Sequence, residues 1–271
     1  MLTDPEIPPK TETGHEQAIL EALADGQAEM AVARLQALKA DLYASIPAKR
    51  RQSQGITWVV ETIGERLYAA SPPAQALQVG LALSALLADD DVLQGAPIFM
   101  LATVGVLDPT GIEPFFAKAA GSPHWVVREE AAGAFRRVIK THPAQAQGWL
   151  STLAQATSPN LRRFSSETLR PVVENRWMRM TPEYSLAVLR LLFKEPHPYP
   201  RTSVGNNLSD LSRPNPELIF RIVAELMASG DANSAWIAYR ACRNLVKKEP
   251  LRVLDVLGVA EYHYKDRNFY R

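Results

Sequence analysis

The second half of the chain repeats a helical pattern at intervals of about 40 residues, and this periodicity constrains the fold more than any other feature. Four segments open with Pro, aromatic or polar residues, continue with an apolar residue and Arg, and then become rich in small residues. They are HWVVREEAAGAF from 124, PNLRRFSSETLR from 159, YPRTSVGNNLSD from 199 and AWIAYRACRNLV from 235. The residues aligned in this way are Arg128, Arg162, Arg201 and Tyr239. Their spacings are 34, 39 and 38 residues.

Between these segments lie further amphipathic stretches, which are predicted to be second helices: residues 143–156, 182–193 and 216–228. A helical pair cannot bury its apolar face alone, so neighbouring pairs stack. The sequence therefore predicts an all-α fold, a right-handed solenoid of HEAT-like helical repeats. The small residues expected to allow close helix packing are Ala131, Ala132, Ser165, Ser166, Gly205, Ala241 and Cys242.

The first half of the chain repeats less clearly. Apolar residues recur at three-to-four spacing and predict helices over 28–43, 54–70 and 73–88. Residues 1–14 contain three prolines and no such periodicity, which predicts a mobile tail. The expected organisation is one HEAT-like domain over 15–271, with degenerate or capping pairs over 15–123 and the clearest repeats over 124–258.

Composition excludes several classes of protein. A single cysteine cannot form an internal disulfide or a cysteine-rich zinc site. The chain contains no run of about 18 apolar residues, so no membrane span is expected. The N-terminal residues lack the apolar core of a signal peptide. These features favour a cytoplasmic protein.

The net charge of +1 hides an uneven distribution. Residues 1–124 hold 8 basic and 15 acidic residues, whereas residues 125–271 hold 22 basic and 14 acidic residues. A basic half can attract a polyanion locally, because charges act over a Debye length of about 8–10 Å. Solvated helix faces with clustered basic residues are the alternative interpretation.

The common catalytic signatures are absent, including the P-loop, His-Glu-x-x-His and Gly-x-Ser-x-Gly. The five histidines have no metal-ligand spacing, so we expect neither a metal nor a cofactor. Cys242 lies in a helix predicted over 236–246 and is expected to be a packed structural thiol.

The four repeat segments together resemble the AlkD/AlkC group of HEAT-repeat DNA alkylation-repair proteins. The resemblance covers roughly residues 124–258, about half of the chain. Its most specific parts are Ser203–Asp210 with the Pro-rich helix start that follows, and Arg243–Lys248 leading to Leu257 and Gly258.

This resemblance implies a monofunctional DNA glycosylase, which hydrolyses the N-glycosidic bond of cationic N-alkylated purines such as 3-methyladenine and 7-methylguanine in duplex DNA. It also implies that a Trp and a carboxylate one helical turn apart contact the damaged nucleotide. Trp125 and Glu129 match that spacing, and residues i and i+4 share one helix face. An aromatic face attracts a cationic base, and a carboxylate stabilises an oxocarbenium-like sugar.

The best-known glycosylases of this group use Asp where this chain has Glu129. The extra methylene of Glu displaces the carboxylate by about 1 Å, and a displacement of that size lowers the rate of catalysis. The alternative acids are Glu130 and Asp210. The sequence also allows Glu129 to be a first-turn acid that favours the helix dipole, and Trp125 to be a plug in the core or between repeats.

The side chains predicted to contact DNA are Arg162, Arg163, Arg201, Trp236, Arg243, Lys247 and Lys248. For Arg162 and Arg201 the sequence equally allows inter-repeat hydrogen bonds to acids, with Asp210 as the natural partner. Trp236 also fits a packing role.

Two function classes remain open from the sequence. The first is an alkylpurine glycosylase or a catalytically weak relative that binds damaged DNA. The second is a HEAT-repeat scaffold for protein interactions. The uneven charge and the resemblance favour the first. We therefore expect a monomer that binds duplex DNA with alkylated bases in the bacterial cytoplasm, associated with the nucleoid when bound, and that needs neither membrane nor metal.

Overall fold

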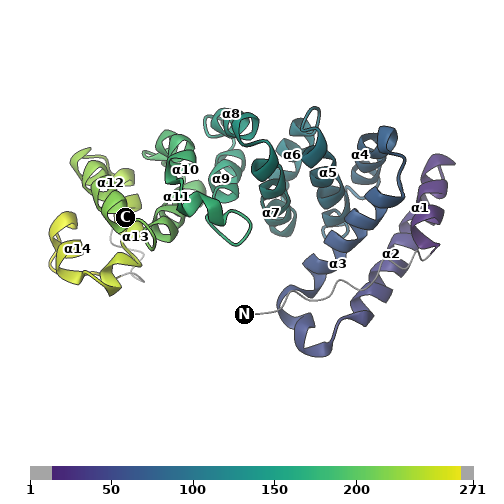
Figure 1. Cartoon of the computed structure of the whole chain (residues 1–271), viewed down its shortest axis with the longest axis horizontal. Helices are drawn as coiled ribbons and strands as arrows, with labels where there is room; N and C mark the ends of the chain where they lie inside the picture. Colours follow the sequence, from purple (N-terminus) through teal and green to yellow (C-terminus); the bar gives the residue numbers. More distant parts are fainter. Residues whose placement is uncertain (1–13, 264–271) are drawn as a thin grey trace. The chain divides into compact units, whose positions relative to one another are not determined.

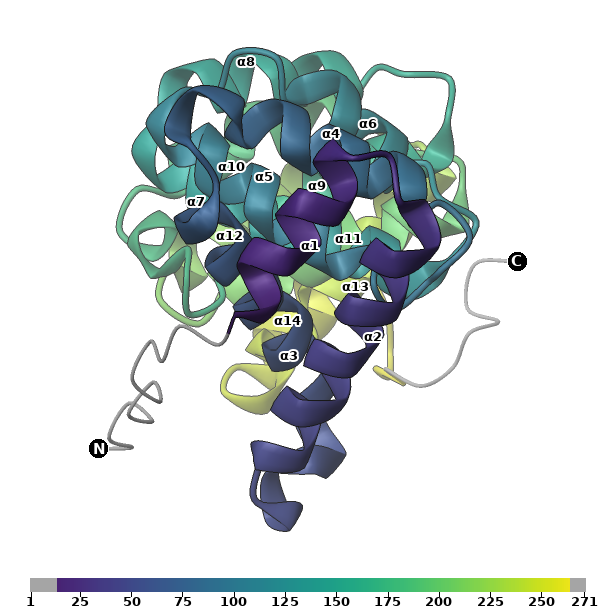
Figure 2. The same ribbon diagram turned by 90° about the vertical axis from the view of Figure 1, so that its right-hand side faces the viewer.

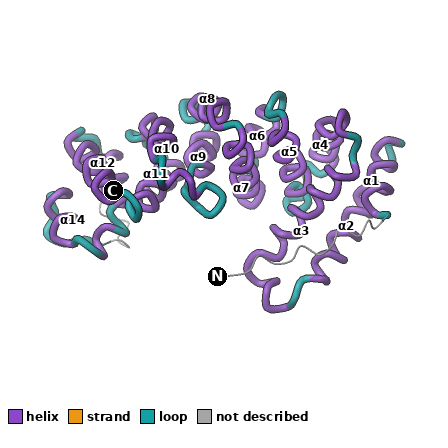
Figure 3. Tube along the Cα trace, in the orientation of Figure 1, coloured by secondary structure: helices purple, strands orange, loops and turns teal. Residues whose placement is uncertain are grey.

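The computed structural model describes residues 14–263, apart from the side chains of residues 49, 50 and 52–54. Within these residues every regular element is a helix and none is a strand (Figure 3). The predicted all-α fold is therefore confirmed. The segment predicted to be a mobile tail, 1–14, lies outside the described residues except for Gly14.

The chain divides into two compact units, which meet in sequence between Ile112 and Glu113. This boundary falls close to the start of the clear repeats. The expectation of one domain over 15–271 stays a prediction, and the units are described separately below.

Unit 1 is a small helical bundle. Its described elements are α1 (His15–Ala24), α2 (Ala28–Ser45), α3 (Ala48–Ala70), η1 (Pro73–Gln75), α4 (Ala76–Leu86) and α5 (Gly95–Leu107). Helix α1 packs along α2, and both contact α3 (Figure 2). Helices α3 and α4 also pack against α5. The buried side chains of this core include Leu35, Leu38, Ile63 and Met100.

All three helices predicted in unit 1 are present with shifted ends. Helix α3 begins six residues before the predicted start at 54, directly after Pro47. Its first turns are polar, so they lack the apolar spacing on which the prediction depended. The stretch predicted as one helix over 73–88 is a 3-10 turn followed by α4.

Unit 2 is a stack of helical pairs with an outer and an inner layer (Figure 1). The outer helices are α6 (Glu113–Ala120), α8 (Pro143–Leu153), α10 (Pro182–Leu189), α12 (Pro216–Ala228) and α14 (Pro250–Leu257). The inner helices are α7 (Trp125–Thr141), α9 (Pro159–Thr168), α11 (Pro198–Leu211) and α13 (Ala232–Ala241). Short 3-10 turns are η2 (Arg176–Arg179), η3 (Arg190–Leu192) and η4 (Leu245–Lys247). Each inner helix packs against the next, as expected for HEAT-like repeats.

Proline marks most helix starts in unit 2. A proline at the first helical residue costs no hydrogen bond, because a backbone N–H at that position has no acceptor within the helix. The helices that begin with proline are α8, α9, α10, α11, α12 and α14.

The predicted equivalence of the repeat arginines is confirmed. Arg128, Arg162 and Arg201 are each the fourth residue of their inner helix. The alignment of the last repeat is wrong by one helical turn, because the fourth residue of α13 is Ala235 and Tyr239 is the eighth. Residues four apart lie on the same helix face, so the sequence pattern did not distinguish them.

An aromatic cluster fixes α7 against its neighbours. The ring centroid of Phe135 lies 5.1 Å from that of Phe116, 5.6 Å from that of Phe164 and 4.9 Å from that of Trp149. These rings come from α6, α7, α8 and α9. Large buried rings dominate core energetics, so the cluster holds α7 and α9 in a defined register.

Candidate nucleic-acid interface

Helix α7 presents Trp125 and Glu129 on one face of the inner layer. Trp125 is the first helical residue, and Glu129 follows one turn later. Trp125 is 59% exposed, which does not fit a plug in the core. The side chain of Glu129 is 30% exposed.

An arginine from the next inner helix holds Glu129. Arg163 Nη1 donates to Glu129 Oε1 at 2.6 Å, and Arg163 Nη2 lies 3.4 Å from Glu167 Oε2. The guanidinium carbon of Arg163 also lies 4.3 Å from the ring centroid of Tyr199. The carboxylate of Glu129 is therefore fixed in place and partly balanced in charge.

Glu167 is a buried charged residue beneath this ion pair. It is 3% exposed, and it accepts hydrogen bonds from Ser203 Oγ at 2.8 Å and from Arg170 Nη1 at 3.0 Å. Arg136 donates to its backbone carbonyl at 3.2 Å. Burial alone would raise the pKa of the Glu167 carboxyl, but Arg163, Arg170 and the serine hydroxyl hold that pKa below its usual range. The acid thus stays ionised and ties three inner helices together.

Tyr199 connects the same helices, and sequence reasoning missed it. Its hydroxyl accepts from Arg128 Nε at 3.2 Å, and the guanidinium of Arg128 lies 5.4 Å from the ring centroid. Arg128 also donates to the carbonyls of Ser122 and Pro123 in the turn before α7. The aromatic residue at the start of α11 indicated a helix start, but nothing local indicated a partner 71 residues away.

Arg162 makes inter-repeat bonds, as the alternative interpretation predicted. Its Nε and Nη2 bond to both oxygens of Glu195 at 2.7 and 2.9 Å. Its Nη1 bonds to the carbonyls of Ala156 and Thr157, the pattern seen at Arg128. The partner acid is Glu195, not the expected Asp210. A phosphate contact by Arg162 stays a prediction.

The two alternative catalytic acids lie in different surroundings. Glu130 is only 5% exposed, on the side of α7 that faces the interior. Asp210 lies 2.7 Å from Arg170 and 3.7 Å from Arg243. Of the neighbouring acids Glu129 and Glu130, only Glu129 is accessible from the inner surface.

A second aromatic cluster lies on α11 and α13. The guanidinium carbons of Arg201 and Arg240 lie 4.8 and 5.5 Å from the ring centroid of Trp236. Arg201 donates to Asn233 Oδ1, and Arg240 Nε donates to Asn206 Oδ1 at 2.9 Å. We call these five residues the Trp236 cluster. Here each arginine bonds to a neutral amide.

The remaining predicted basic contacts extend from this cluster. Arg243 Nη1 lies 3.4 Å from Asn206 Oδ1. Lys247 and Lys248, in and directly after η4, are exposed. Basic side chains thus continue beyond α13.

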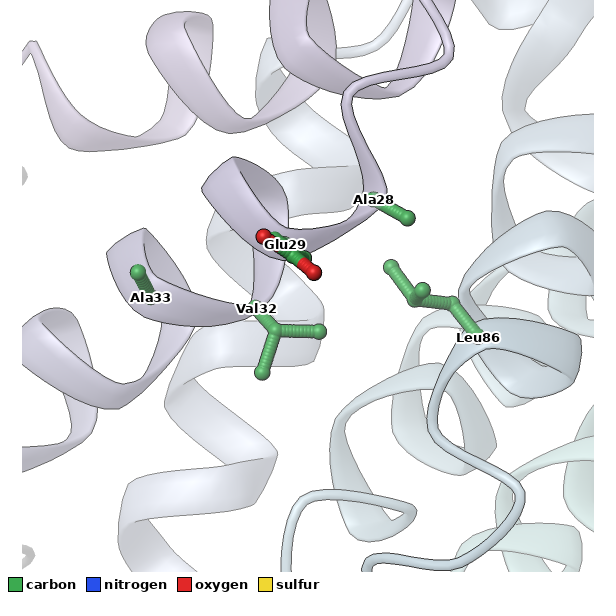
Figure 4. Close-up of a pocket in the computed structure, with 5 residues that line it drawn as sticks. All are labelled: Ala28, Glu29, Val32, Ala33 and Leu86. Carbon is green, nitrogen blue, oxygen red and sulfur yellow. The ribbon is translucent and has the colours of Figure 1, made fainter.

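Other features of the described residues carry no comparable chemistry. Burial raises the pKa of the Cys242 thiol to about 12, as expected for a packed cysteine. An open pocket in unit 1 has one carboxylate, Glu29, among apolar side chains (Figure 4). Across residues 14–263 no group of His, Cys, Asp or Glu is arranged to hold a metal ion. None of the helices in that range has the length and apolar character to cross a bilayer.

Comparisons with known proteins agree with this architecture. No family model matches the chain. The uncharacterized protein YhaZ of Bacillus subtilis is 31% identical over 121 residues, which cover 42% of this chain and 32% of YhaZ. The chain therefore matches about a third of that protein's length.

Two solved structures share the fold. One is the Pseudomonas fluorescens alkylpurine DNA glycosylase AlkC bound to DNA containing an abasic site analog, with a TM-score of 0.59 and 22% identity. That match covers 83% of this chain and 66% of AlkC, slightly under two thirds of its length. The other is AlkD2 from Streptococcus mutans, with a TM-score of 0.59 and 18% identity. That match covers 77% of this chain and 96% of AlkD2. In fold, the chain is an AlkD/AlkC-like helical-repeat protein.

Proposed function

We propose that this protein repairs alkylated DNA. It binds duplex DNA along the inner layer of unit 2 and hydrolyses the N-glycosidic bond of cationic N-alkylated purines such as 3-methyladenine and 7-methylguanine. The observation that carries this proposal is the exposed Trp125 ring one turn from a fixed carboxylate, Glu129, on a basic unit. The shared fold with a DNA-bound alkylpurine glycosylase supports it.

The chemistry requires little more than charge stabilisation. An N-alkylated purine carries a positive charge, so cleavage of its glycosidic bond releases a neutral base and leaves the positive charge on the deoxyribose. The Glu129 carboxylate stabilises that sugar cation until water adds to the anomeric carbon and loses a proton to solvent. The Trp125 ring attracts the cationic nucleotide. No side chain has to protonate the base.

The DNA contacts in this proposal come from basic side chains of the inner helices and of the turn that follows α13: Arg163, Arg201, Arg243, Lys247 and Lys248. The protein acts as a monomer without a cofactor, in the cytoplasm.

The direct test is release of bases from N-methylated duplex DNA. We expect the purified protein to release 3-methyladenine and 7-methylguanine, measured by liquid chromatography against a protein-free control. The neutral base 1,N6-ethenoadenine should leave slowly, because its departure needs protonation. Release of that base as fast as 3-methyladenine would contradict the mechanism.

One observation favours a second candidate, a DNA-binding protein without glycosylase activity. The ion pair with Arg163 balances the charge of Glu129, and a balanced carboxylate stabilises a cation less. Binding of methylated duplex without release of either base would support this candidate. Failure to bind DNA at low salt would instead favour a protein-interaction scaffold.

A further inference from the structure

The ring of Trp236 is already engaged by the protein's own cations. Two guanidinium carbons, from Arg201 on α11 and Arg240 on α13, lie within 5.5 Å of its centroid. Guanidinium groups within about 6 Å of an aromatic centroid are attracted to it. The ring therefore orients two arginines, and this arrangement differs from an open surface on which a base could stack.

A glycine in α11 makes this geometry possible. A Cβ atom placed on Gly205 would lie 2.9 Å from Arg240 Cβ and 3.0 Å from its Cγ and Cδ. The stem of Arg240 thus lies directly on the backbone of α11. Its Nε then bonds to Asn206 on the same helix. Arg240 is fixed along its whole length before any ligand arrives.

The acceptors within the Trp236 cluster are neutral. Arg201 and Arg240 bond to asparagine oxygens, which orient a guanidinium without cancelling its charge. The two acids whose charges act on Arg201 are engaged elsewhere: Glu195 with Arg162, and Asp231 with Ser234 at the start of α13. The cluster therefore places two guanidinium groups at a fixed position beside one ring.

We infer that the Trp236 cluster is a phosphate subsite: Arg201 and Arg240 bind a phosphodiester group of the DNA backbone, and Trp236 is a positioning residue that orients them. Planar guanidinium groups match phosphate oxygens, and preorganised side chains lose less entropy on binding. The subsite acts on damaged and undamaged DNA alike. It rests on the DNA-binding part of the proposed function and is independent of the chemistry at Glu129.

The test measures the affinity for an undamaged duplex by fluorescence anisotropy over a range of salt concentrations. Each lost phosphate contact should reduce the slope of log K against log salt by about 0.9. Because both arginines bind the same phosphate, we expect the full reduction in the Arg201→Gln/Arg240→Gln double variant and part of it in each single variant. The matched control is Arg252→Gln on α14, since Arg252 also lies over an aromatic ring, Phe220, but bonds to Glu217 and Glu249. Its slope should equal that of wild type.

Two further variants test how the arginines are held. Gly205→Ala should displace Arg240 and reduce the slope as Arg240→Gln does. Trp236→Leu should weaken binding in the wild-type protein but not in the Arg201→Gln/Arg240→Gln protein, because it acts through those arginines. Circular dichroism checks that each variant is folded, and the two Arg→Gln variants keep the test valid if either repacked variant unfolds.

The outcomes separate this inference from the proposed function. If wild type does not bind DNA at low salt, both fail. If wild type binds and the double Arg→Gln variant keeps its salt slope, only the subsite fails. An additive loss from Trp236→Leu in the double variant would overturn the positioning role. Single-turnover base release by the control variant Arg252→Gln should stay within about twofold of wild type, because Arg252 lies outside the subsite.

Discussion

The two ends of the inner layer use the same pairing of arginine with an aromatic ring, but they surround it with different acceptors. At the α7–α9 end, Arg163 lies on Tyr199 and bonds to Glu129 above the buried Glu167. At the α11–α13 end, Arg201 and Arg240 lie on Trp236 and bond to amides. Carboxylate partners offset the charge of the arginine and give a rigid site suited to stabilising a cation. Amide partners orient the guanidinium groups without adding negative charge, which suits the binding of a polyanion.

One position of the repeat contributes to this difference. The ninth residue of the inner helix is Glu167 in α9, Asn206 in α11 and Arg240 in α13. An acid, an amide and a base thus occupy equivalent places. The residue at this position therefore contributes to the local charge along the layer.

The largest expected effect lies at the α7–α9 end. Glu129→Gln keeps the size of the side chain but removes the charge that stabilises the sugar cation. Base release from methylated duplex should fall about a hundredfold, with DNA affinity unchanged or slightly higher. Glu217→Gln, an exposed acid on the outer layer, is the matched control. Unchanged release by Glu129→Gln would make Asp210 the next acid to test.

The buried acid at the same end should matter for stability. Glu167→Gln removes the charge that three arginines surround, and we expect the free energy of unfolding to fall by about 2 kcal/mol at pH 7. Because the folded pKa of Glu167 is depressed, its contribution is present above the unfolded value of about 4.3 and is lost as the pH falls through the folded pKa. Urea unfolding of both proteins at pH 7 and below pH 4 measures this. An unfolding difference that is the same at both pH values would contradict the assignment.

A smaller effect, on DNA affinity, is expected when the amide at the α11–α13 end is replaced by an acid like that at the α7–α9 end. Asn206→Asp places a carboxylate beside Arg240 and Arg243, as Glu167 lies beside Arg163. The affinity for undamaged duplex should fall about tenfold at moderate salt, since one acid both repels phosphate and competes for the arginines. Asn206→Ala separates the added charge from the lost hydrogen bond. Equal affinities of the Asp and Ala variants would show that charge at this position does not set DNA affinity.

The smallest expected effect is on the affinity for methylated DNA relative to undamaged DNA, and it differs between the two ends. Trp125→Ala should weaken binding of a methylated duplex by about fivefold and leave binding of an undamaged duplex unchanged, because the ring attracts the cationic nucleotide. Arg240→Gln should weaken both equally. Paired competition measurements with the two duplexes check this. Equal losses for both duplexes in Trp125→Ala would remove its proposed contact with the lesion.

Sequence periodicity predicted the parts of the molecule that depend on local spacing. The helices and the shared face of Trp125 and Glu129 follow from spacings of three to four residues, and the equivalent arginines follow from the repeat interval. Tyr199, Glu167 and Arg240 were not identified, because each has a defining partner between 34 and 71 residues away. Whether an arginine meets an acid or an amide depends on the register between stacked pairs, which the spacing of one helix does not reveal.

The close approach of Arg240 to Gly205 also has a consequence for engineering this chain. Glycine inside a helix costs about 1 kcal/mol in helix propensity relative to alanine, so replacing it is a common way to stabilise a protein. Gly148 in α8 has space for a methyl group, since no neighbouring side chain lies within 4 Å of where its Cβ would be. Gly205 offers the same intrinsic gain, but the methyl group would strike the stem of Arg240. A stabilised version of this protein can therefore take alanine at the outer layer, while the inner layer keeps a less helix-favouring residue where two helices touch.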